Sequence, residues 1–289
     1  MAKLKYGIVG YPVKHSFSPA MQNAAFKELG IDAEYSLFEV EPKDLEAFLG
    51  SLKAKGISGL NVTIPHKIKT SEYLEKNGSL DDNAKRLGAV NTIKVTGGGL
   101  SGFNTDGPGF YRSLLEDLRI EPEGKNVFVL GAGGAAKAIV MYLGNTPKKI
   151  AVYDVDPGKT GELADHYAKY FDAGKLRVVS GESEMKAVLG ESNLLINATP
   201  IGMNGSDPSP VEKTLLHPGL YVYDLVYNKP YTPLVKEANS MKVHAVTGLG
   251  MLLYQGAIAF EIWTGKKAPV NVMRRALREA LQQEKKDHL

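Results

Sequence analysis

The chain has 289 residues, of which 43% are hydrophobic and 23% charged, and it has no cysteine. The length favours two domains, and the composition is that of an ordinary globular protein. The lack of cysteine excludes disulfides, thiolate metal sites and Cys nucleophiles, and a net charge of +3 is too small to indicate nucleic-acid binding. No apolar run approaches the roughly 18 residues of a membrane span. With no apolar signal core before the first strand pattern, we expect a cytoplasmic protein.

The first hundred residues alternate strand and helix patterns. Strands are expected at Tyr6–Gly10, Glu34–Val40, Leu60–Ile64, Val90–Val95 and Leu100–Phe103, with a helix at Pro42–Lys55. Another helix is expected to begin with Ser18 as N-cap and Pro19 at the first helical position, and to stop at Gly30. This alternation predicts a largely parallel sheet that is covered on both faces.

The second half of the chain alternates more regularly. Strands are expected at Lys125–Leu130, Ile150–Asp154, Leu176–Val179, Leu194–Asn197, Leu220–Leu225 and Val243–Val246. This pattern is typical of a doubly wound nucleotide-binding domain. Two further helices, Met251–Trp263 and Val270–Glu284, are not needed to complete that sheet and could pack back on the first domain.

We therefore predict an α/β protein of two domains with a cleft between them. The substrate-binding and catalytic domain is expected at residues 1–106 plus 250–289. A Rossmann-like dinucleotide-binding domain, with a doubly wound parallel sheet, is expected at residues 107–249.

A glycine-rich turn follows the strand pattern at Lys125–Leu130. It reads Gly131-Ala132-Gly133-Gly134-Ala135 and leads into a helix pattern. Glycines allow a sharp turn and a close approach by a pyrophosphate, and the helix N-terminus offers free N–H groups to the phosphates. The alternative is a tight turn without a ligand.

Asp154 ends the next strand pattern, 23 residues after Gly131. A carboxylate there can accept hydrogen bonds from the adenosine ribose and would repel a 2′-phosphate, which favours NAD over NADP. Lys159 is close enough in sequence to meet a phosphate, so NADP stays open. A strand-end turn residue is the structural alternative for Asp154.

Polar side chains recur in the first domain at strand ends and turns. Taken singly each is more easily read as structural, but the set of amides and hydroxyls with one lysine and one aspartate suits a small polyhydroxylated anion. Gln255 joins the set because a buried amide on an apolar helix needs a partner. The set is Ser16, Ser18, Asn61, Thr63, Lys67, Asn91, Asp106 and Gln255.

The chain resembles the shikimate dehydrogenase family, which includes the quinate/shikimate dehydrogenases. The matching motifs run in the family's order over nearly the whole chain. They are Gly10-Tyr-Pro-Val-Lys-His-Ser16-Phe-Ser18-Pro, Asn61-Val-Thr-Ile-Pro-His-Lys67, Gly88-Ala-Val-Asn91-Thr, Gly102-Phe-Asn-Thr-Asp106-Gly, Gly131-Ala-Gly-Gly134, Asn197-Ala-Thr-Pro-Ile-Gly-Met203, Asp224-Leu-Val-Tyr227-Asn and Gly248-Leu-Gly-Met-Leu-Leu-Tyr-Gln255.

The resemblance implies reversible reduction of 3-dehydroshikimate to shikimate by a nicotinamide cofactor, in chorismate and aromatic amino-acid biosynthesis. It implies that Lys67 and Asp106 are catalytic and that no metal is used. The implied carboxylate ligands are Ser16 and Ser18, and the implied ligands of the substrate hydroxyls are Asn61, Thr63, Asn91, Asp106 and Gln255, with Tyr227 nearby. The implied cofactor site is Gly131, Ala132, Gly133, Gly134, Ala135, Asp154, Thr199, Met203, Val226, Gly248 and Met251.

One departure from the family pattern concerns the cofactor. NADP-dependent members usually carry Asn-Arg-Thr where this chain reads Asp154-Val155-Asp156. Two acids and no arginine again favour NAD, and they raise the chance of a catabolic quinate/shikimate dehydrogenase. A methylene-tetrahydrofolate dehydrogenase shares a lysine and a related two-domain plan, and a non-catalytic metabolite sensor could use the same fold. Small-molecule partners and a monomer or homodimer are expected, without nucleic acid or membrane.

Overall fold

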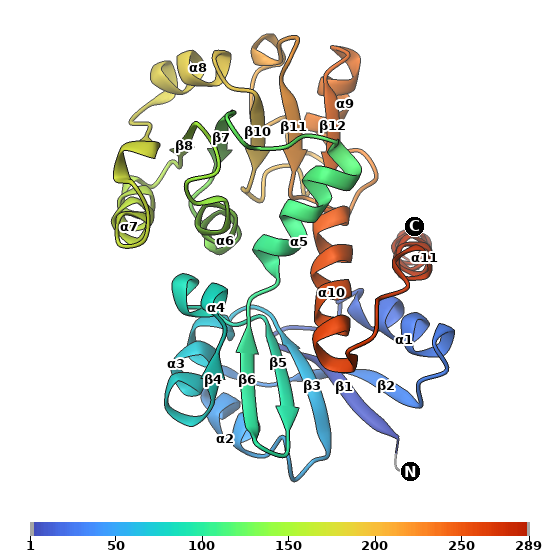
Figure 1. Ribbon diagram of the computed structural model, residues 1–289. Coiled ribbons are helices and arrows are strands. Elements are labelled where there is room, and N and C mark those ends of the chain that lie inside the picture. Colours follow the sequence, from blue (N-terminus) through green and yellow to red (C-terminus); the bar gives the residue numbers. More distant parts are fainter. Residues whose placement is uncertain (1–2, 288–289) are drawn as a thin grey trace. The chain divides into compact units, whose positions relative to one another are not determined.

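The computed structural model describes the backbone of residues 3–287 and the side chains as far as residue 283. The chain divides into two compact units (Figure 1). The first unit contains the residues up to Gly109 together with those from Leu253 onward, and the second is Phe110–Leu252. The first unit is therefore discontinuous in sequence.

A six-stranded sheet forms the centre of the first unit, in the order β2-β1-β3-β5-β6-β4. Strand β1 is parallel to β2 and β3, β4 is parallel to β6, and β5 is antiparallel to β3 and β6. The sheet is therefore mixed and not largely parallel, because a tight glycine turn joins β5 directly to β6. The strands are β1 (Leu4–Gly10), β2 (Ala33–Glu39), β3 (Ile57–Val62), β4 (Ser79–Leu80), β5 (Thr92–Thr96) and β6 (Gly99–Phe103).

One face of this sheet is covered by short helices. Leu45 and Leu49 of one helix and Leu74 of another pack on Val9 and Leu60 of the strands. The helix predicted over Pro42–Lys55 is shorter, and it ends at Gly50, where glycine disfavours continuation. The helical elements that follow these strands are η1 (Pro42–Asp44), α2 (Leu45–Gly50), α3 (Lys67–Asn77) and α4 (Asp82–Leu87).

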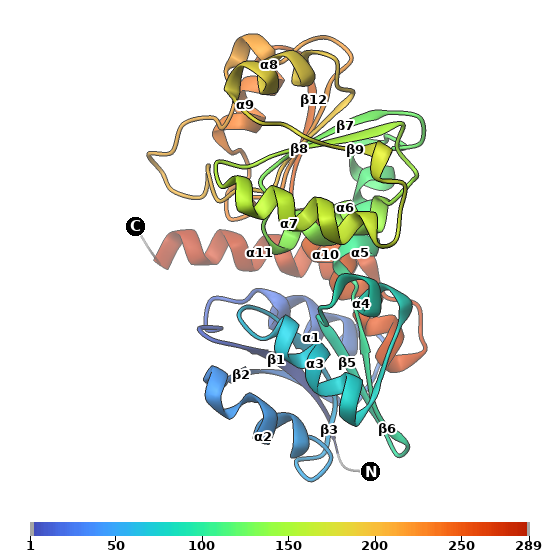
Figure 2. The same cartoon turned by 90° about the vertical axis from the view of Figure 1, so that its left-hand side faces the viewer.

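The opposite face is covered by α1 (Ser18–Glu28) and α10 (Leu249–Thr264), and α11 (Val270–Asp287) packs on α1 (Figures 1 and 2). The ring of Tyr6 lies 5.0 Å from that of Phe26 and 5.3 Å from that of Trp263. Trp263 Nε1 donates to the Ile93 carbonyl at 2.9 Å. A Cβ on Gly59 would lie 2.6 Å from the Trp263 ring, so only glycine lets the indole this close to β3. The last helices thus complete the core of the first unit.

The second unit contains a six-stranded sheet in which all neighbouring strands are parallel. The order is β12-β11-β10-β7-β8-β9, so the sheet grows in opposite directions from its first strand, β7. The carboxyl ends of β7 and β10 flank this switch point, where doubly wound sheets bind ligands. The strands are β7 (Asn126–Leu130), β8 (Lys149–Tyr153), β9 (Leu176–Val178), β10 (Leu194–Asn197), β11 (Tyr221–Asp224) and β12 (His244–Thr247).

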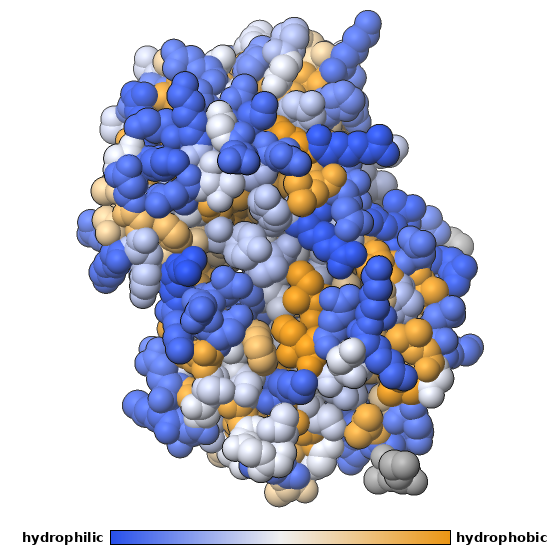
Figure 3. Space-filling model, viewed as in Figure 1, coloured by the Kyte–Doolittle hydropathy of each residue, from blue (hydrophilic) through white to orange (hydrophobic). Residues whose placement is uncertain are grey.

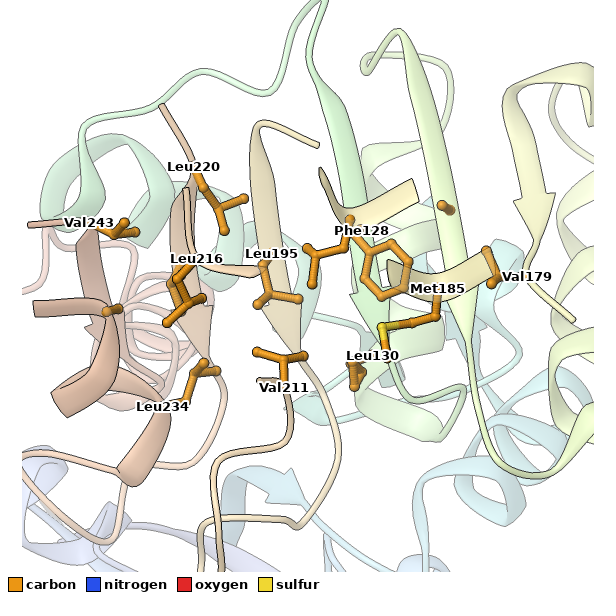
Figure 4. Packing of buried hydrophobic residues seen from close by; sticks show 14 residues of the cluster. Phe128, Leu130, Val179, Met185, Leu195, Val211, Leu216, Leu220, Leu234 and Val243 are labelled. Carbon is orange, nitrogen blue, oxygen red and sulfur yellow. The ribbon is translucent and has the colours of Figure 1, made fainter. Parts of the chain in front are cut away.

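Helices lie on both sides of the second sheet, with α8 and α9 on one side and α6 and α7 on the other (Figure 1). Phe128 and Leu195 of the strands pack with Met185 of α8 and Leu234 of α9 (Figure 4). The remaining elements are α5 (Asp106–Ser113), the π-helical η2 (Leu114–Leu118), α6 (Gly134–Leu143), α7 (Pro157–Ala168), η3 (Ala173–Lys175), α8 (Glu182–Gly190), η4 (Lys213–Leu215) and α9 (Pro233–Ser240).

The surface seen in Figure 3 is mainly hydrophilic, and its hydrophobic residues form small separate groups. Among the residues that the structure describes, no helix combines the length and apolar character needed to cross a membrane.

Candidate functional site

A lysine–aspartate pair lies at the start of two helices of the first unit. Lys67 is the first residue of α3 and Asp106 the first of α5, and Lys67 Nζ donates to Asp106 Oδ2 at 2.7 Å. Their side chains are 30% and 13% exposed, so both remain accessible to a small molecule. The pair combines an ammonium that can donate a proton with a carboxylate that orients it.

Asn91 holds the other oxygen of the same carboxylate. Its Nδ2 donates to Asp106 Oδ1 at 2.8 Å and to Thr105 Oγ1 at 3.0 Å. Its Oδ1 accepts from the Thr105 backbone N–H at 2.9 Å and from Thr92 Oγ1 at 3.0 Å. Asn91 is only 2% exposed. Asn91 therefore orients the Asp106 carboxylate from the protein interior, and little of its own side chain is exposed.

Asn61 is engaged in the same way, one strand further along the sheet. Its Nδ2 donates to the Asn91 carbonyl at 3.3 Å and to Thr92 Oγ1 at 3.1 Å, and its Oδ1 accepts from the Tyr35 hydroxyl at 2.7 Å. Both amide hydrogens are thus used within the protein. Thr63, two residues on, is half-buried just beyond the end of β3 and is the more accessible of the two.

The two serines exchange the structural roles that the sequence suggested. Ser18 was expected to be the N-cap, but it is the first residue of α1, and the N-cap position is held by Phe17, which makes no side-chain capping bond. Ser16 Oγ instead accepts from the Ser18 backbone N–H at 3.3 Å. A turn at Val13–Ser16 is closed by a backbone hydrogen bond and brings Ser16 close to the start of α1. Ser16, and not Ser18, therefore supplies the side-chain oxygen that accepts from a backbone N–H at this helix start. Ser16 is half-buried, and Ser18 is buried.

Gln255 lies on α10, in the part of that helix that belongs to the first unit. A Cβ on Gly109 would come within 2.5 Å of the Gln255 backbone nitrogen, so α5 and α10 touch one turn after Asp106. The return of the chain thus brings half-buried Gln255 to the helix that begins with Asp106.

In the second unit, the glycine-rich turn leaves the carboxyl end of β7. Gly131 has φ +96°, which favours glycine, and a Cβ on it would lie 3.0 Å from the Ala198 backbone. A Cβ on Gly133 or Gly134 would meet no protein atom within 4 Å, so the space above the turn is open. Helix α6 begins there with no side-chain cap and no acid in its first turn. These features fit a bound pyrophosphate.

Asp154 follows β8 and contacts this turn directly. Its Oδ2 accepts from the Ala132 backbone N–H at 2.8 Å, and its Oδ1 accepts from the Asp156 N–H at 2.9 Å. Asp154 therefore supports the turn. A carboxylate has about four lone-pair sites, so two remain for further donors. Lys159 lies 3.8 Å from Asp156, not from Asp154, in an exposed pair.

A buried network joins the loops that follow β10 and β11. Asp224 is fully buried, and its Oδ1 accepts from Asn197 Nδ2 at 2.8 Å while its Oδ2 accepts from Thr232 Oγ1. Asn197 Oδ1 in turn accepts from Thr199 Oγ1 at 2.7 Å. Burial raises the pKa of Asp224, and the bonds from Thr232, Val226 and Asn197 lower it in part. The network fixes the start of both loops.

The other expected cofactor residues lie on this same carboxyl edge of the sheet. Met203 is exposed, whereas Val226 is buried. Tyr227, which was expected to bind substrate, follows Val226 and is exposed. A Cβ on Gly248 would lie 2.1 Å from the Leu225 carbonyl oxygen, so no side chain fits there. The Met251 N–H donates to the Tyr223 hydroxyl at 3.1 Å.

Sequence reasoning missed Thr105, Tyr35 and Thr232. Thr105 stands between two residues of a noted motif, so the polar run Asn104–Asp106 was a usable signal. Tyr35 lies in an ordinary strand pattern, and Thr232 lies eight residues from its partner Asp224, so neither had a local signal. Within the residues that the structure describes, no cluster of His, Cys, Asp and Glu could hold a metal ion.

Known proteins match the chain along its length. Residues 8–93 match the shikimate dehydrogenase substrate binding domain, and residues 248–278 match the shikimate 5'-dehydrogenase C-terminal domain. A shikimate dehydrogenase (NADP(+)) of Methanopyrus kandleri is 43% identical over 95% of each chain.

Two solved structures extend the comparison to the fold. A crystal structure of shikimate dehydrogenase in complex with NADP+ has a TM-score of 0.88 and 38% identity and covers 96% of each chain. A shikimate 5-dehydrogenase from Listeria monocytogenes, in complex with shikimate and NAD, has a TM-score of 0.88 and 33% identity and covers 95% of this chain and 96% of its own.

A mixed α/β unit carrying a lysine–aspartate pair and a parallel-sheet unit carrying a glycine-rich turn define a nicotinamide-dependent oxidoreductase. Both the sequence and the fold are similar to those of shikimate dehydrogenases over nearly the whole chain, and the chain belongs to the shikimate dehydrogenase family.

Proposed function

We propose that this protein is a shikimate dehydrogenase, which reduces 3-dehydroshikimate reversibly to shikimate. The observation that carries the proposal is the Lys67–Asp106 pair, accessible and surrounded by buried amides and hydroxyls of the first unit. A polyhydroxylated ring with a carboxylate needs donors and acceptors in fixed directions, and the polar set around this pair supplies them. The pathway role implied by the family, aromatic amino-acid biosynthesis, and a cytoplasmic location are parts of the same proposal.

In this proposal Lys67 is the acid. Its ammonium donates a hydrogen bond to the substrate's carbonyl oxygen and gives that oxygen a proton as negative charge develops on it. Asp106 holds the ammonium at 2.7 Å and accepts from a neighbouring substrate hydroxyl. Ser16 and Ser18 would bind the carboxylate, and Thr63 and Gln255 the remaining polar groups. In the reverse direction, Lys67 takes the proton back.

The second unit is proposed to bind the nicotinamide dinucleotide, which supplies the hydride when bound. The open space above Gly133 and Gly134 and the uncapped start of α6 fit its pyrophosphate. Thr199 and Met203 follow β10, which flanks the switch point, where a nicotinamide ring is expected, and Gly248 follows the edge strand β12 at the same edge of the sheet.

The residues that follow β8 bear on the choice between NAD and NADP. The Methanopyrus kandleri relative is named for NADP(+), which speaks against a preference for NAD. Of the two solved structures, one contains NADP+ and the other contains NAD. Asp154 and Asp156 place two carboxylates after β8, and Val155 between them is 89% exposed and offers no charge to a phosphate. On this local chemistry we propose that the protein accepts NAD.

A quinate/shikimate dehydrogenase with a catabolic role is the second candidate. It is favoured only by the same pair of acids where NADP-dependent members carry an arginine.

A steady-state assay that crosses shikimate and quinate with NAD and NADP tests the proposal. Turnover of shikimate at a kcat/KM well above that for quinate is expected, with NAD accepted. Turnover of neither substrate would overturn the function, and a strong preference for NADP would overturn the cofactor argument alone.

A further inference from the structure

Tyr35 bonds Asn61, a residue of the predicted substrate site, from two strands away in the sheet. It lies on β2, opposite Tyr6 of β1, while Asn61 of β3 lies opposite Ile8 of β1. Its side chain therefore crosses β1 to reach β3. There the phenol donates to Asn61 Oδ1 at 2.7 Å.

The phenol and the amide that it bonds are both buried. Tyr35 is 2% exposed and Asn61 is 4% exposed. A phenol has one hydrogen to donate, and in Tyr35 it goes to Asn61 Oδ1. The direction of the Asn61 amide is thus set by a phenol from β2 as well as by the bonds of its own Nδ2.

The backbone of Tyr35 is pinned by the helix that Ser18 begins. Asn23 Oδ1 accepts from the Tyr35 N–H at 2.8 Å, and Asn23 Nδ2 donates to the Tyr35 carbonyl at 3.0 Å. β2 is an edge strand, so Asn23 takes the place of a neighbouring strand. The backbone of Tyr35 is therefore held to α1, which leaves its phenol little freedom to shift away from Asn61.

We propose that Tyr35 is a positioning residue of the substrate site, which fixes the direction of the Asn61 amide. Without the phenol hydrogen, Asn61 Oδ1 loses its donor, and its amide can turn over. Asn61 also bonds the Asn91 carbonyl, so the displacement reaches the residue that holds Asp106. This inference rests on the proposed function, because it assigns Tyr35 to the binding of that substrate.

The variant Tyr35→Phe removes one hydroxyl and keeps the ring. The matched control is Tyr6→Phe, because Tyr6 is a buried phenol of the adjacent strand on the same sheet face and in the same aromatic cluster. For each variant and the wild type, steady-state assays in which shikimate or the cofactor is varied give kcat, the KM for shikimate and the KM for the cofactor. Urea unfolding measures the stability of each protein.

Tyr35→Phe is expected to raise the KM for shikimate about tenfold, the size of one lost hydrogen bond, and to leave the KM for the cofactor unchanged. Tyr6→Phe should change neither KM more than about twofold. A merely structural role would lower the active fraction and kcat without changing the KM for shikimate. That result, or equal effects of the two variants, would overturn the inference. Wild-type protein without activity on shikimate would instead overturn the proposed function.

Discussion

Asn91 Nδ2 donates to Asp106 Oδ1 at 2.8 Å, while Lys67 holds Oδ2 of the same carboxylate at 2.7 Å. The carboxylate is therefore fixed in its plane by one neutral donor and one charged donor. Asn91 is itself held by Thr92 and Thr105, so the direction of the lysine ammonium is set by buried residues. Mutation of Lys67 should therefore affect mainly the rate of the reaction, whereas mutation of Asn91 should affect the stability of the fold.

Lys67→Ala should lower kcat for shikimate oxidation by about 10²–10⁴, because it removes the proton donor and acceptor. The KM for shikimate should change little, since Ser16, Ser18 and Gln255 remain. Steady-state kinetics measure both constants. Lys69→Ala, at an exposed position on the same helix, is the control and should retain full activity. Near wild-type turnover by the Lys67 variant would remove Lys67 from the mechanism.

Asn91→Ala should lower the free energy of unfolding by about 1–3 kcal/mol, because the buried Thr105 N–H loses its acceptor. Urea unfolding measures the change. Asn77→Ala is a suitable comparison, since Asn77 is exposed and bonds only the Tyr73 carbonyl among the described contacts, and it should change stability by less than about 0.5 kcal/mol. Equal effects of the two changes would contradict the buried network.

Asp224 should make stability depend on pH. Burial raises its pKa, so the folded protein keeps this proton to a higher pH than the unfolded chain does. Its contribution to stability is present below the unfolded pKa and is lost as pH rises through the raised folded pKa. Compared with Asp224→Asn, the wild type should therefore gain free energy of unfolding as pH falls from about 7 to about 4. A difference that does not vary with pH, or that varies the other way, would refute this.

Gly109→Ala should destabilise the first unit by about 1–3 kcal/mol, because its Cβ would lie 2.5 Å from the Gln255 nitrogen. Gly161→Ala, inside α7 with no protein atom within 4 Å of the added Cβ, should instead stabilise by about 0.5–1 kcal/mol. Urea unfolding compares the two. A harmless Gly109 variant would mean that α5 and α10 are not in close contact.

The double variant Asp154→Asn with Val155→Arg should raise kcat/KM for NADP roughly 10–100-fold relative to that for NAD, the range of one charged hydrogen bond to a phosphate. Val155 is exposed, so the arginine adds no burial cost. Asp156→Asn alone is the control and should shift the ratio far less. An unchanged ratio would show that the 2′-phosphate is recognised elsewhere.

The sequence predicted the second sheet well, since its strands and the glycine turn are local patterns in chain order. The mixed first sheet was less predictable, because the pairing of β5 with β3 depends on contacts distant in sequence. Lys67 and Asp106 were identified as a pair by residue type alone. The Asn23–Tyr35 clamp and the Asp224–Thr232 bond could not be predicted, because nothing in the local sequence distinguishes an amide or hydroxyl that meets a buried partner.

The discontinuous first unit constrains how the protein can be made. Gln255, Trp263 and the rest of α10 leave the ribosome only after the whole second unit has been synthesised. Tyr6 of β1 and Phe26 of α1 must therefore wait for Trp263 and Phe260 of α10 to cover them, while Phe110–Leu252 can fold as soon as it emerges. A nascent chain stopped before residue 253 would carry a finished nucleotide unit and an uncovered apolar face, which makes that stage the one most in need of a chaperone.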